Sequence, residues 1–396
     1  MQKLTILVKP LKVVLINTLY APHFVGGAEK SVQLLAEGLH QLGHNAVVIS
    51  LSAANKNKIQ IVNGIKVYYL ANRNIYWPFQ NKSVSKFKKS FWHVIDTYFS
   101  LYNRNIDAIL KEELPDIIHT NNLSGFSTSL LSYLKSKKYP IIHTARDYYL
   151  MCFKNTLYKN GKVCDKLCRD CSILSHWKFK QINKNVDRFI GISKYVVSRH
   201  LNSGLSKNIP TEYIYNAVID VKEKSNKTKK QNVFGYIGAL NEAKGLELLL
   251  GIFCSDNLKN QDWKLKIAGR GSSDYVDYLK SFYTNEKIEF VGFVDAMEFY
   301  KGLDALIVPS QWEEPFGRVV IEAAQMGLTV FVSEKGGLVE LIPLLNSVKK
   351  LNMNSILEFI AEDKHKIEIY NSLNQFDNKT ITDKYINAYK KVLSLN

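Results

Sequence analysis

Short apolar runs alternate with longer segments of helical periodicity, and this alternation begins at residue 12. Strands of a parallel sheet form near-continuous apolar runs when helices cover both faces of the sheet. In the first half of the chain, runs of this kind lie at residues 12–17, 46–50, 66–70, 116–119, 140–144 and 187–191. Helical segments fall between them, notably residues 27–42 and 125–137. The pattern therefore predicts a parallel sheet covered on both faces.

The same alternation restarts after a charged polar run at residues 221–230, whose composition is typical of a linker. The later apolar runs lie at residues 233–238, 264–268, 288–291, 305–308 and 329–332. A last helix is predicted from about residue 380 to 395. Because 396 residues are too many for one core, we predict two α/β domains, residues 1–221 and 222–377.

The amino-acid composition excludes several classes of protein. A hydrophobic fraction of 46% excludes wholesale disorder. The chain has no uninterrupted run of about 18 apolar residues, so no transmembrane helix is predicted. The first ten residues have too short an apolar core for a signal peptide. We therefore expect a cytoplasmic protein.

The net charge of +17 is concentrated in the first half of the chain. Residues 1–222 hold 31 Lys and Arg against 13 Asp and Glu, a balance of +18, and residues 223–396 hold 22 against 23, a balance of −1. A general bias toward lysine would affect both halves alike. The asymmetry indicates an anionic surface or acceptor at the first domain.

Residues 82–110 combine lysines with aromatic side chains and contain no proline. Interpreted as one helix, this stretch has an aromatic side and a basic end, as helices at membrane surfaces do. That would place the protein at the inner face of a membrane as a peripheral protein. A core-packing helix with a solvated lysine end remains the alternative. No nucleic-acid partner is expected, because no binding motif accompanies the charge.

The second domain contains the stretch PSQWEEPFGR at residues 309–318, followed by an apolar helical run. Pro315 keeps Glu314 out of the helix, whereas Glu322 lies on it, about 7–8 Å from its first turn. The amides of Phe316, Gly317 and Arg318 lie at the helix start, where a diphosphate is favoured. The two carboxylates can then accept hydrogen bonds from the two ends of a nucleotide-sugar. A Pro-Phe-Gly turn with two surface glutamates is the alternative.

This stretch closely resembles the donor-site motif of the retaining glycosyltransferases of family 4, and the resemblance extends along most of the chain. It implies the GT-B fold, in which two doubly wound, Rossmann-like domains face a cleft. The last helix, residues 378–396, would then cross back to the first domain. The resemblance further implies that Glu314 contacts hydroxyls of the donor sugar and that Glu322 holds the nucleotide ribose.

Glycine-rich turns of the chain also match this family. Gly26 and Gly27 follow the first predicted strand, and glycine lets backbone amides approach a phosphate without a Cβ in the way. The resemblance implies that this loop closes over the donor diphosphate. The turn at residues 336–340, GGLVE, resembles the family's second glycine-rich turn, whose amides also meet the donor.

The loop at residues 238–245, GALNEAKG, departs from the family pattern at one position. The family usually carries an arginine and a lysine there, and both neutralise the leaving diphosphate as negative charge builds on it. Lys244 is present, but Ala239 stands in place of the arginine. Arg270 and Arg318 are the candidates to replace the missing charge. An ordinary surface lysine is the alternative for Lys244.

Two predicted strands of the first domain end in polar residues, HTNN at 119–122 and HTARD at 143–147. Strand ends of this kind face the cleft of the implied fold. Family members often carry histidines here that touch the donor sugar and the acceptor, so His119 and His143 are candidates, although a histidine at a strand end is often structural. Asn121 and Arg146 stand where histidine is frequent. Asp147 is a candidate to orient the acceptor hydroxyl.

Four of the five cysteines lie close together in a lysine-rich segment, at Cys152, Cys164, Cys168 and Cys171. Four neighbouring thiols in a reducing compartment favour a structural tetrahedral zinc over two disulfides. The spacing of the last pair is common in zinc sites, but the first two gaps are not. Disulfides and free thiols therefore remain open.

Together these features predict a retaining, metal-independent hexosyltransferase. We expect a UDP- or GDP-sugar donor, a saccharide or lipid-linked saccharide acceptor, and a role in surface polysaccharide or lipopolysaccharide synthesis. The resemblance to family 4 implies that catalysis needs no cofactor, and a diphosphate oxygen can take the acceptor proton, so no strong protein base is required. One alternative is a GT-B epimerase acting on a nucleotide-sugar. The other is a non-catalytic basic protein that binds membrane or nucleic acid.

Overall fold

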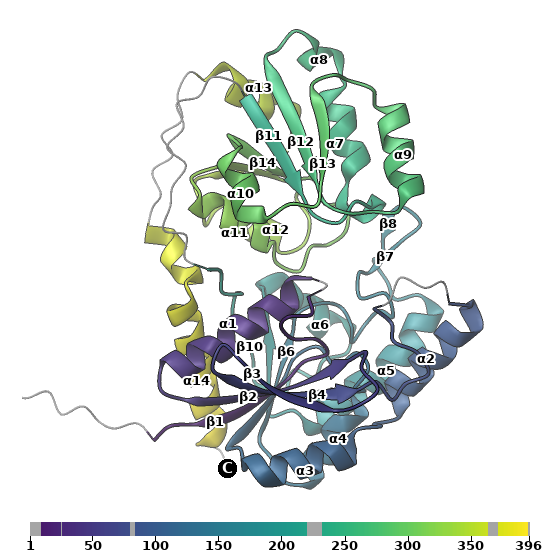
Figure 1. The fold of residues 1–396 in the computed structure, drawn as a ribbon, viewed down its shortest axis with the longest axis vertical. Coiled ribbons are helices and arrows are strands. Elements are labelled where there is room, and N and C mark those ends of the chain that lie inside the picture. Colours follow the sequence, from purple (N-terminus) through teal and green to yellow (C-terminus); the bar gives the residue numbers. More distant parts are fainter. Residues whose placement is uncertain (1–8, 25, 80–83, 220–231, 363–370, 395–396) are drawn as a thin grey trace, which may run out of the picture.

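A computed structural model describes residues 9–24, 26–79, 84–219, 232–362 and 371–394. It contains two α/β domains that face each other (Figure 1). The predicted linker at residues 221–230 lies outside the described residues. The boundary near residue 221 therefore stays a prediction. None of the helices in the described part of the chain combines the length and hydropathy that a bilayer crossing requires.

The first domain is built on an eight-stranded sheet of order β10-β9-β6-β5-β1-β2-β4-β3. Its strands are β1 (Lys12–Ile16), β2 (Asn45–Ser52), β3 (Lys58–Val62), β4 (Ile65–Ala71), β5 (Ile117–Thr120), β6 (Ile141–Ala145), β9 (Arg188–Gly191) and β10 (Thr211–Tyr213). All neighbours are parallel except β3 and β4. The six predicted strands are confirmed within two residues. The sequence analysis missed β3 and β10, which are the two edge strands and are only partly buried.

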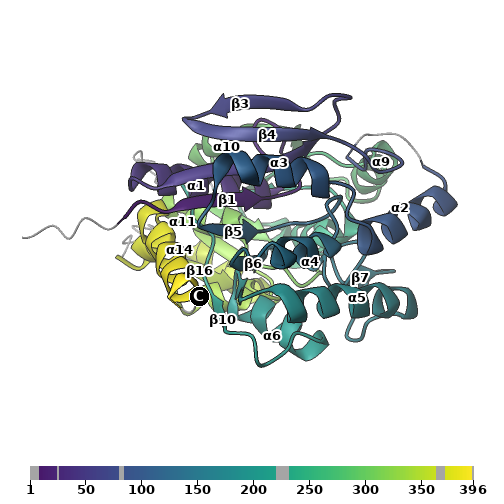
Figure 2. The same ribbon diagram turned by 90° about the horizontal axis from the view of Figure 1, so that it is seen from below.

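Helices cover both faces of this sheet, as its apolar strands require (Figure 2). They are α1 (Gly27–Gln41), α2 (Lys86–Tyr98), α3 (Asn103–Glu113), α4 (Ser129–Ser136), α5 (Arg169–Asn185) and α6 (Lys194–Ser203). The prediction of one helix over residues 82–110, of which 82 and 83 lie outside the described residues, was wrong, because α2 ends at Tyr98 and the backbone of Phe99 after it is extended. Helix α4 also starts later than predicted, because Gly125 and Ser127 have positive φ.

The second domain contains a six-stranded, all-parallel sheet of order β13-β12-β11-β14-β15-β16. Its strands are β11 (Asn232–Ile237), β12 (Trp263–Ala268), β13 (Ile288–Gly292), β14 (Ala305–Val308), β15 (Thr329–Val332) and β16 (Val348–Lys350). This is the strand order of a doubly wound dinucleotide-binding sheet. Its helices are α7 (Leu246–Phe253), α8 (Asp256–Lys259), α9 (Ser273–Phe282), α10 (Ala296–Lys301), α11 (Arg318–Gln325), α12 (Leu338–Leu341) and α13 (Met353–Ala361), with a 3₁₀ turn at Glu242–Lys244.

The last helix, α14 (Asn378–Leu393), returns to the first domain and lies against α1 (Figures 1 and 2). The two helices approach closely at Gly38, where a Cβ would lie 2.2 Å from Thr382 Oγ1. Tyr389 of α14 is fully buried against the first sheet. One cluster of buried apolar side chains continues from the first sheet through Phe316 to α14. The crossing helix therefore ties the two domains into one packed unit.

Candidate active site

Each sheet has one point where its chain order reverses, and ligands of doubly wound sheets bind beyond the strand ends at that point. In the first domain the reversal lies between β1 and β5, and in the second it lies between β11 and β14. The loop after β1 carries Gly26 and Gly27, and the loop after β11 carries Lys244. The loop after β14 carries Glu314. Topology alone therefore places the predicted donor loops at the two reversal points.

Glu314 lies in a ring of hydrogen-bond donors from its own domain. Lys244 Nζ lies 2.9 and 3.2 Å from the two carboxylate oxygens. Trp312 Nε1 donates to Glu314 Oε2 at 2.8 Å, and Ser310 Oγ donates to the same oxygen at 3.0 Å. Lys244 Nζ also lies 4.8 Å from the centre of the Trp312 ring. The structure thus brings two predicted site residues, 70 positions apart in sequence, into direct contact.

The glycine-rich turn at Gly336 and Gly337 supports the backbone of Glu314. The Gly337 N–H donates to the Glu314 carbonyl at 2.7 Å. Gly336 has a positive φ of 58°, and a Cβ there would lie 2.3 Å from the same carbonyl oxygen. Only glycine allows this approach without displacing the loop. In this structure the turn packs directly against the loop that carries Glu314.

Glu322 lies one turn into α11 and pairs with Arg318, whose Nη2 is 3.0 Å from Glu322 Oε1. Tyr300 donates its hydroxyl to the other oxygen at 3.4 Å. Arg318 Nη1 donates to Ser31 Oγ of α1 in the first domain, at 3.1 Å. A Cβ on Gly27 would lie 3.0 Å from Arg318 Cδ. Arg318 therefore sits between the glycine loop of the first domain and the helix start of the second.

The two candidates for the missing arginine differ in position. Arg318 touches the glycine loop, as described above. Arg270 instead stacks on Phe293, with its guanidinium carbon 4.3 Å from the ring centre. Ala239 offers only its carbonyl, which accepts the Tyr236 hydroxyl at 2.7 Å. Arg318 is therefore the better placed of the two to take over the charge that Ala239 lacks.

Both candidate histidines lie inside the first domain rather than at its surface. His119 is fully buried, and its Nδ1 and Nε2 bond with Tyr389 Oη at 2.8 Å and Thr144 Oγ1 at 2.7 Å. His143 is 1% exposed and bonds with Thr120 Oγ1 at 2.9 Å. Burial lowers the pKa of both, that of His143 to about 3. These neutral rings lie in the core of the first domain, so the mechanism proposed below does not use them.

Asn121 and Arg146 form a buried polar pair next to the chain segment that leaves the first domain. Arg146 donates from Nε to Asn121 Oδ1 at 2.8 Å and from Nη1 to Asn216 Oδ1 at 2.6 Å. Asn121 is 1% exposed and Arg146 6% exposed. These contacts fix the ends of β5 and β6 relative to each other and to residue 216.

Asp147, directly after Arg146, is half-buried and held at both oxygens. The Tyr149 N–H donates to its Oδ1 at 2.8 Å, and Asn122 Nδ2 donates to its Oδ2 at 2.9 Å. Burial, with a smaller contribution from Glu29 of α1, raises the pKa of Asp147 to about 6, although the Tyr149 N–H and Lys178 act in the opposite direction. Glu29 in turn accepts the Gly26 N–H at 3.0 Å. Asp147 thus interacts electrostatically with the side chain that holds the glycine loop, and its acceptor role stays a prediction.

The domains meet at the loop that carries Glu314. Tyr148 donates its hydroxyl to the Glu313 carbonyl at 2.8 Å, and Ser193 Oγ donates to the Pro315 carbonyl at 2.7 Å. The Phe316 ring stacks on Tyr215 at 5.4 Å. Sequence reasoning missed Tyr148, Ser193 and Tyr215. No spacing signal could have found them, because each contact joins residues at least 101 positions apart.

The four clustered cysteines come together beside this interface. The Cys171 thiol hydrogen-bonds with the thiols of Cys152 and Cys168, and Cys164 is near enough to interact with both of these electrostatically. The bond between the two buried thiols lowers the pKa of Cys152 and raises that of Cys171. All the cysteines are free thiols. Within the described residues, no group of three or more potential ligands is arranged to hold a metal ion.

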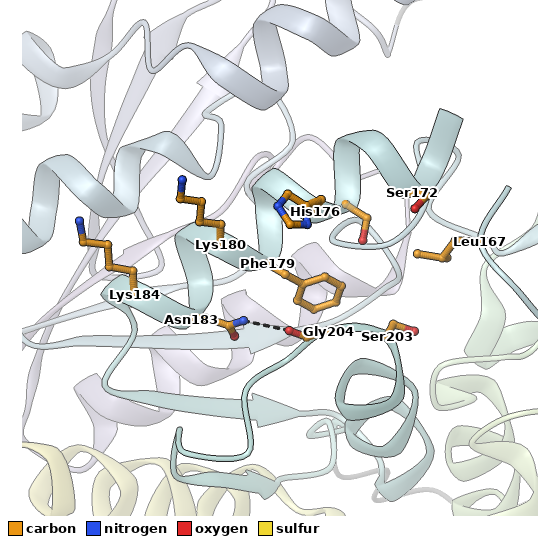
Figure 3. Close-up of a pocket in the computed structure, with 10 residues that line it drawn as sticks. Leu167, Ser172, His176, Phe179, Lys180, Asn183, Lys184, Ser203 and Gly204 are labelled. Atoms are coloured by element: carbon orange, nitrogen blue, oxygen red, sulfur yellow. Dashed lines mark hydrogen bonds between the residues drawn. The ribbon is translucent and has the colours of Figure 1, made fainter. Parts of the chain in front are cut away.

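A surface pocket of about 630 Å³ lies elsewhere on the first domain, between α5 and α6 (Figure 3). Phe179 and two lysines line it, and the Asn183 side chain closes one side by donating to the Gly204 carbonyl at 2.9 Å. Its lining contains none of the residues predicted to bind the donor. We therefore do not assign the donor to this pocket.

Sequence comparisons identify relatives of this chain. The family model "Glycosyltransferase Family 4" matches residues 25–220, and "Glycosyl transferases group 1" matches residues 218–346. An uncharacterised 42.6 kDa protein in the cps region of Klebsiella pneumoniae is 34% identical over 96% of this chain and all of its own length. The O-antigen biosynthesis glycosyltransferase WclY of Escherichia coli is 24% identical over 72% of this chain and 82% of its own.

Solved structures share the fold. Sucrose-phosphate synthase from Thermosynechococcus elongatus superimposes with a TM-score of 0.74 at 17% identity, over 98% of this chain and all of its own. Anabaena HepE, solved with UDP and glucose, gives 0.65 at 16% identity, over 96% of this chain and 99% of its own. The predicted GT-B fold is confirmed. The chain is a GT-B glycosyltransferase, and its activity is glycosyl transfer.

Proposed function

We propose that the chain is a retaining hexosyltransferase that moves a hexose from a UDP- or GDP-sugar to a hydroxyl of a saccharide or lipid-linked saccharide. The observation that carries this proposal is the pairing of Lys244 with Glu314 in the loops at the reversal point of the second sheet. A cation for the diphosphate and a carboxylate for the sugar hydroxyls lie side by side there.

The donor fits this site in one direction. Glu322, on α11, accepts hydrogen bonds from the ribose hydroxyls. The diphosphate lies at the start of α11, where helix amides favour an anion, between Arg318, Lys244 and the Gly26–Gly27 loop. The sugar then extends toward Glu314. HepE was solved with UDP-glucose, which supports a nucleotide-sugar of this kind.

Catalysis in this site depends on charge. As the bond between the sugar and the diphosphate breaks, negative charge grows on the leaving oxygen, and fixed cations stabilise it. Lys244 and Arg318 supply that charge, so we propose chemistry that is independent of a metal. Asp147 accepts a hydrogen bond from the acceptor hydroxyl and orients it. The hydroxyl attacks from the face that the diphosphate leaves, and a diphosphate oxygen takes its proton.

The acceptor belongs, in this proposal, to a surface polysaccharide assembled at the inner face of a membrane. The cps-region relative and the O-antigen glycosyltransferase support that role. So does the charge of the first domain. Its helix α2 exposes Phe87 by 80% and Phe91 by 52% beside exposed lysines at 86, 88 and 89. An apolar and basic face of this kind suits an anionic lipid surface.

A transfer assay tests the proposal. Purified protein is incubated with UDP- and GDP-hexoses, together with polyprenyl-diphosphate-linked or free monosaccharides, and the products are analysed by mass spectrometry and NMR. We expect one donor to give a product with the same anomeric configuration as the donor. An inverted product would exclude retention. Conversion of the nucleotide-sugar to its epimer without an acceptor would replace the proposal by the epimerase alternative.

A further inference from the structure

Lys178, on α5, is a lysine inside the first domain. It is 3% exposed, although lysine is almost never fully buried unless it is paired. Its Nζ donates to the Tyr149 carbonyl at 2.9 Å and lies 3.5 Å from the centre of the Tyr149 ring. The roles assigned above to donor and acceptor do not use this residue. A buried charge that costs several kcal/mol to desolvate calls for a functional explanation.

Tyr149 connects Lys178 to two carboxylates by three separate groups. Its carbonyl accepts the lysine, its N–H donates to Asp147 Oδ1 at 2.8 Å, and its hydroxyl donates to Asp96 Oδ2 at 2.9 Å. Asp96, on α2, is 1% exposed and also accepts the Gly125 N–H. One lysine and two acids are therefore held around a single tyrosine.

Charge balance explains the arrangement. Asp96 and Asp147 both interact electrostatically with Lys178, and both interactions favour the ionised acids. Burial opposes ionisation and raises the pKa of each acid to about 6. Without the lysine, the desolvation of Asp147 would no longer be offset by a buried cation. Asp147 would then carry a proton at a pH where its proposed role needs a free oxygen.

We propose that Lys178 is a positioning residue for glycosyl transfer: its ammonium group balances the buried carboxylates and, through Tyr149, holds the Asp147 carboxylate in place to receive the acceptor hydroxyl. This inference rests on the proposed function of Asp147. The other charged and titratable groups that face Lys178 and Asp147 are His93 of α2, Cys152 of the loop after β6, Cys171 of α5 and Glu29 of α1.

The Lys178→Met variant keeps the apolar stem and removes the charge. Lys184→Met, on the exposed side of the same helix, is the matched control. In the transfer assay we expect Lys178→Met to lose at least about tenfold in kcat at neutral pH, with little change in the KM for the donor. The acid limb of its pH profile moves upward by at least about one unit, a tenfold change in proton affinity. Lys184→Met behaves as the unmodified protein.

A second readout does not depend on activity. The side-chain carboxyl carbon of Asp147 is followed by ¹³C NMR in protein labelled at aspartate. Its signal is assigned by its disappearance in the Asp147→Asn variant. Its titration midpoint should rise in Lys178→Met and stay in place in Lys184→Met. Asp96→Asn, which removes a buried negative charge, should not raise it. Far-UV circular dichroism and a cooperative thermal unfolding transition serve as the check that each variant is folded.

Different results overturn the two proposals. An unmodified protein that transfers no sugar from any donor would contradict the proposed function, whereas the NMR titration would still test the electrostatic role of Lys178. An unshifted Asp147 midpoint in Lys178→Met, or an unchanged kcat and pH profile, would reject that role. If Lys178→Met does not fold, a rise of the Asp147 midpoint in Asp96→Asn would equally reject the charge balance.

Discussion

Lys244 bonds both carboxylate oxygens of Glu314, at 2.9 and 3.2 Å, in the loops at the reversal point of the second sheet. The lysine comes from the turn after β11 and the glutamate from the loop after β14. A donor that places its diphosphate at Lys244 and its sugar at Glu314 has to exchange part of this ion pair for its own contacts. The pair therefore pre-positions both groups before the donor arrives.

Replacing Lys244 by methionine should remove a charge that acts mainly in the transition state. We expect kcat/KM for transfer to fall by about 10²–10³-fold, the usual effect of losing one preorganised donor to a developing anion. Lys264→Met, at an exposed lysine of the same domain, is the control. Steady-state kinetics with the donor found in the transfer assay measures the effect. A loss of less than about threefold would show that Lys244 does not contact the diphosphate.

Substitutions of Glu314 and Glu322 should have different effects on the affinity for a nucleoside diphosphate. If Glu322 holds the ribose, Glu322→Ala weakens binding of the bare nucleoside diphosphate by about 10–100-fold, the effect of one or two hydrogen bonds to a charged group. Glu314→Ala leaves that binding nearly intact but reduces transfer, because Glu314 meets only the sugar. Calorimetry with UDP and GDP compares them, with Glu298→Ala, at an exposed glutamate, as control. Equal losses of nucleotide affinity would contradict the assigned roles.

Transfer should depend on pH through Asp147. Burial raises the pKa of this carboxyl to about 6. The ionised form, which accepts a hydrogen bond from the hydroxyl of the acceptor sugar, is therefore present above pH 6 and is lost as the pH falls. We therefore expect kcat/KM to decline by about tenfold for each unit below that pH. Asp147→Asn should remove the acid limb. The pKa of the neighbouring Asp96 is also raised to about 6, so the Asp96→Asn variant is the control that tells which of the two acids causes the acid limb. A profile flat from pH 5 to 8 would exclude this role for Asp147.

The sequence predicted the fold well because strand and helix periodicities are local. All eleven predicted strands are present, and the motif at residues 309–318 identified the loop of Glu314 and the start of α11. The two glycine turns were also recognisable, because a tight approach such as that of Gly336 to Glu314 excludes every other residue.

Contacts between distant segments could not be predicted. The bonds of His119 to α14 and of Arg318 to α1 depend on how the domains pack, which no local spacing encodes. The same holds for Lys178, because nothing in the pattern of α5 distinguishes it from the exposed Lys180 and Lys184. The break between α2 and α3 was missed because Phe99 has no proline or glycine beside it to signal it.

The thiol cluster gives a prediction about metal content. Four thiols from residues 152–171 lie near one another, so zinc binding requires only a rearrangement within that segment. We predict about one zinc per chain in protein purified without chelator. The Cys168→Ser, Cys171→Ser double variant should lose it, and Cys254→Ser, at the remote cysteine, should keep it. Elemental analysis of the purified protein measures the zinc content per chain. Protein without metal would reject the zinc site in favour of free thiols or disulfides.

The exposed face of α2 gives a prediction about membranes. Phe87 and Phe91 lie beside exposed lysines at 86, 88 and 89, and each lysine near an anionic leaflet contributes about 1 kcal/mol. We expect the protein to sediment with phosphatidylglycerol vesicles at low salt, to be released at high salt, and to ignore phosphatidylcholine vesicles. Phe87→Ser with Phe91→Ser should weaken binding, whereas Phe282→Ser, at a 67% exposed phenylalanine of the second domain, should not.

The salt dependence separates the two contributions to this binding. Lysines lose their attraction as salt screens the surface within a Debye length, whereas buried phenylalanine rings do not. Lys88→Glu with Lys89→Glu should therefore abolish the preference for anionic vesicles, and the phenylalanine variants should keep that preference at lower affinity. Binding that is indifferent to lipid charge and salt, or no binding at all, would remove the membrane from the proposal. The acceptor would then be a soluble saccharide that reaches Asp147 from solution.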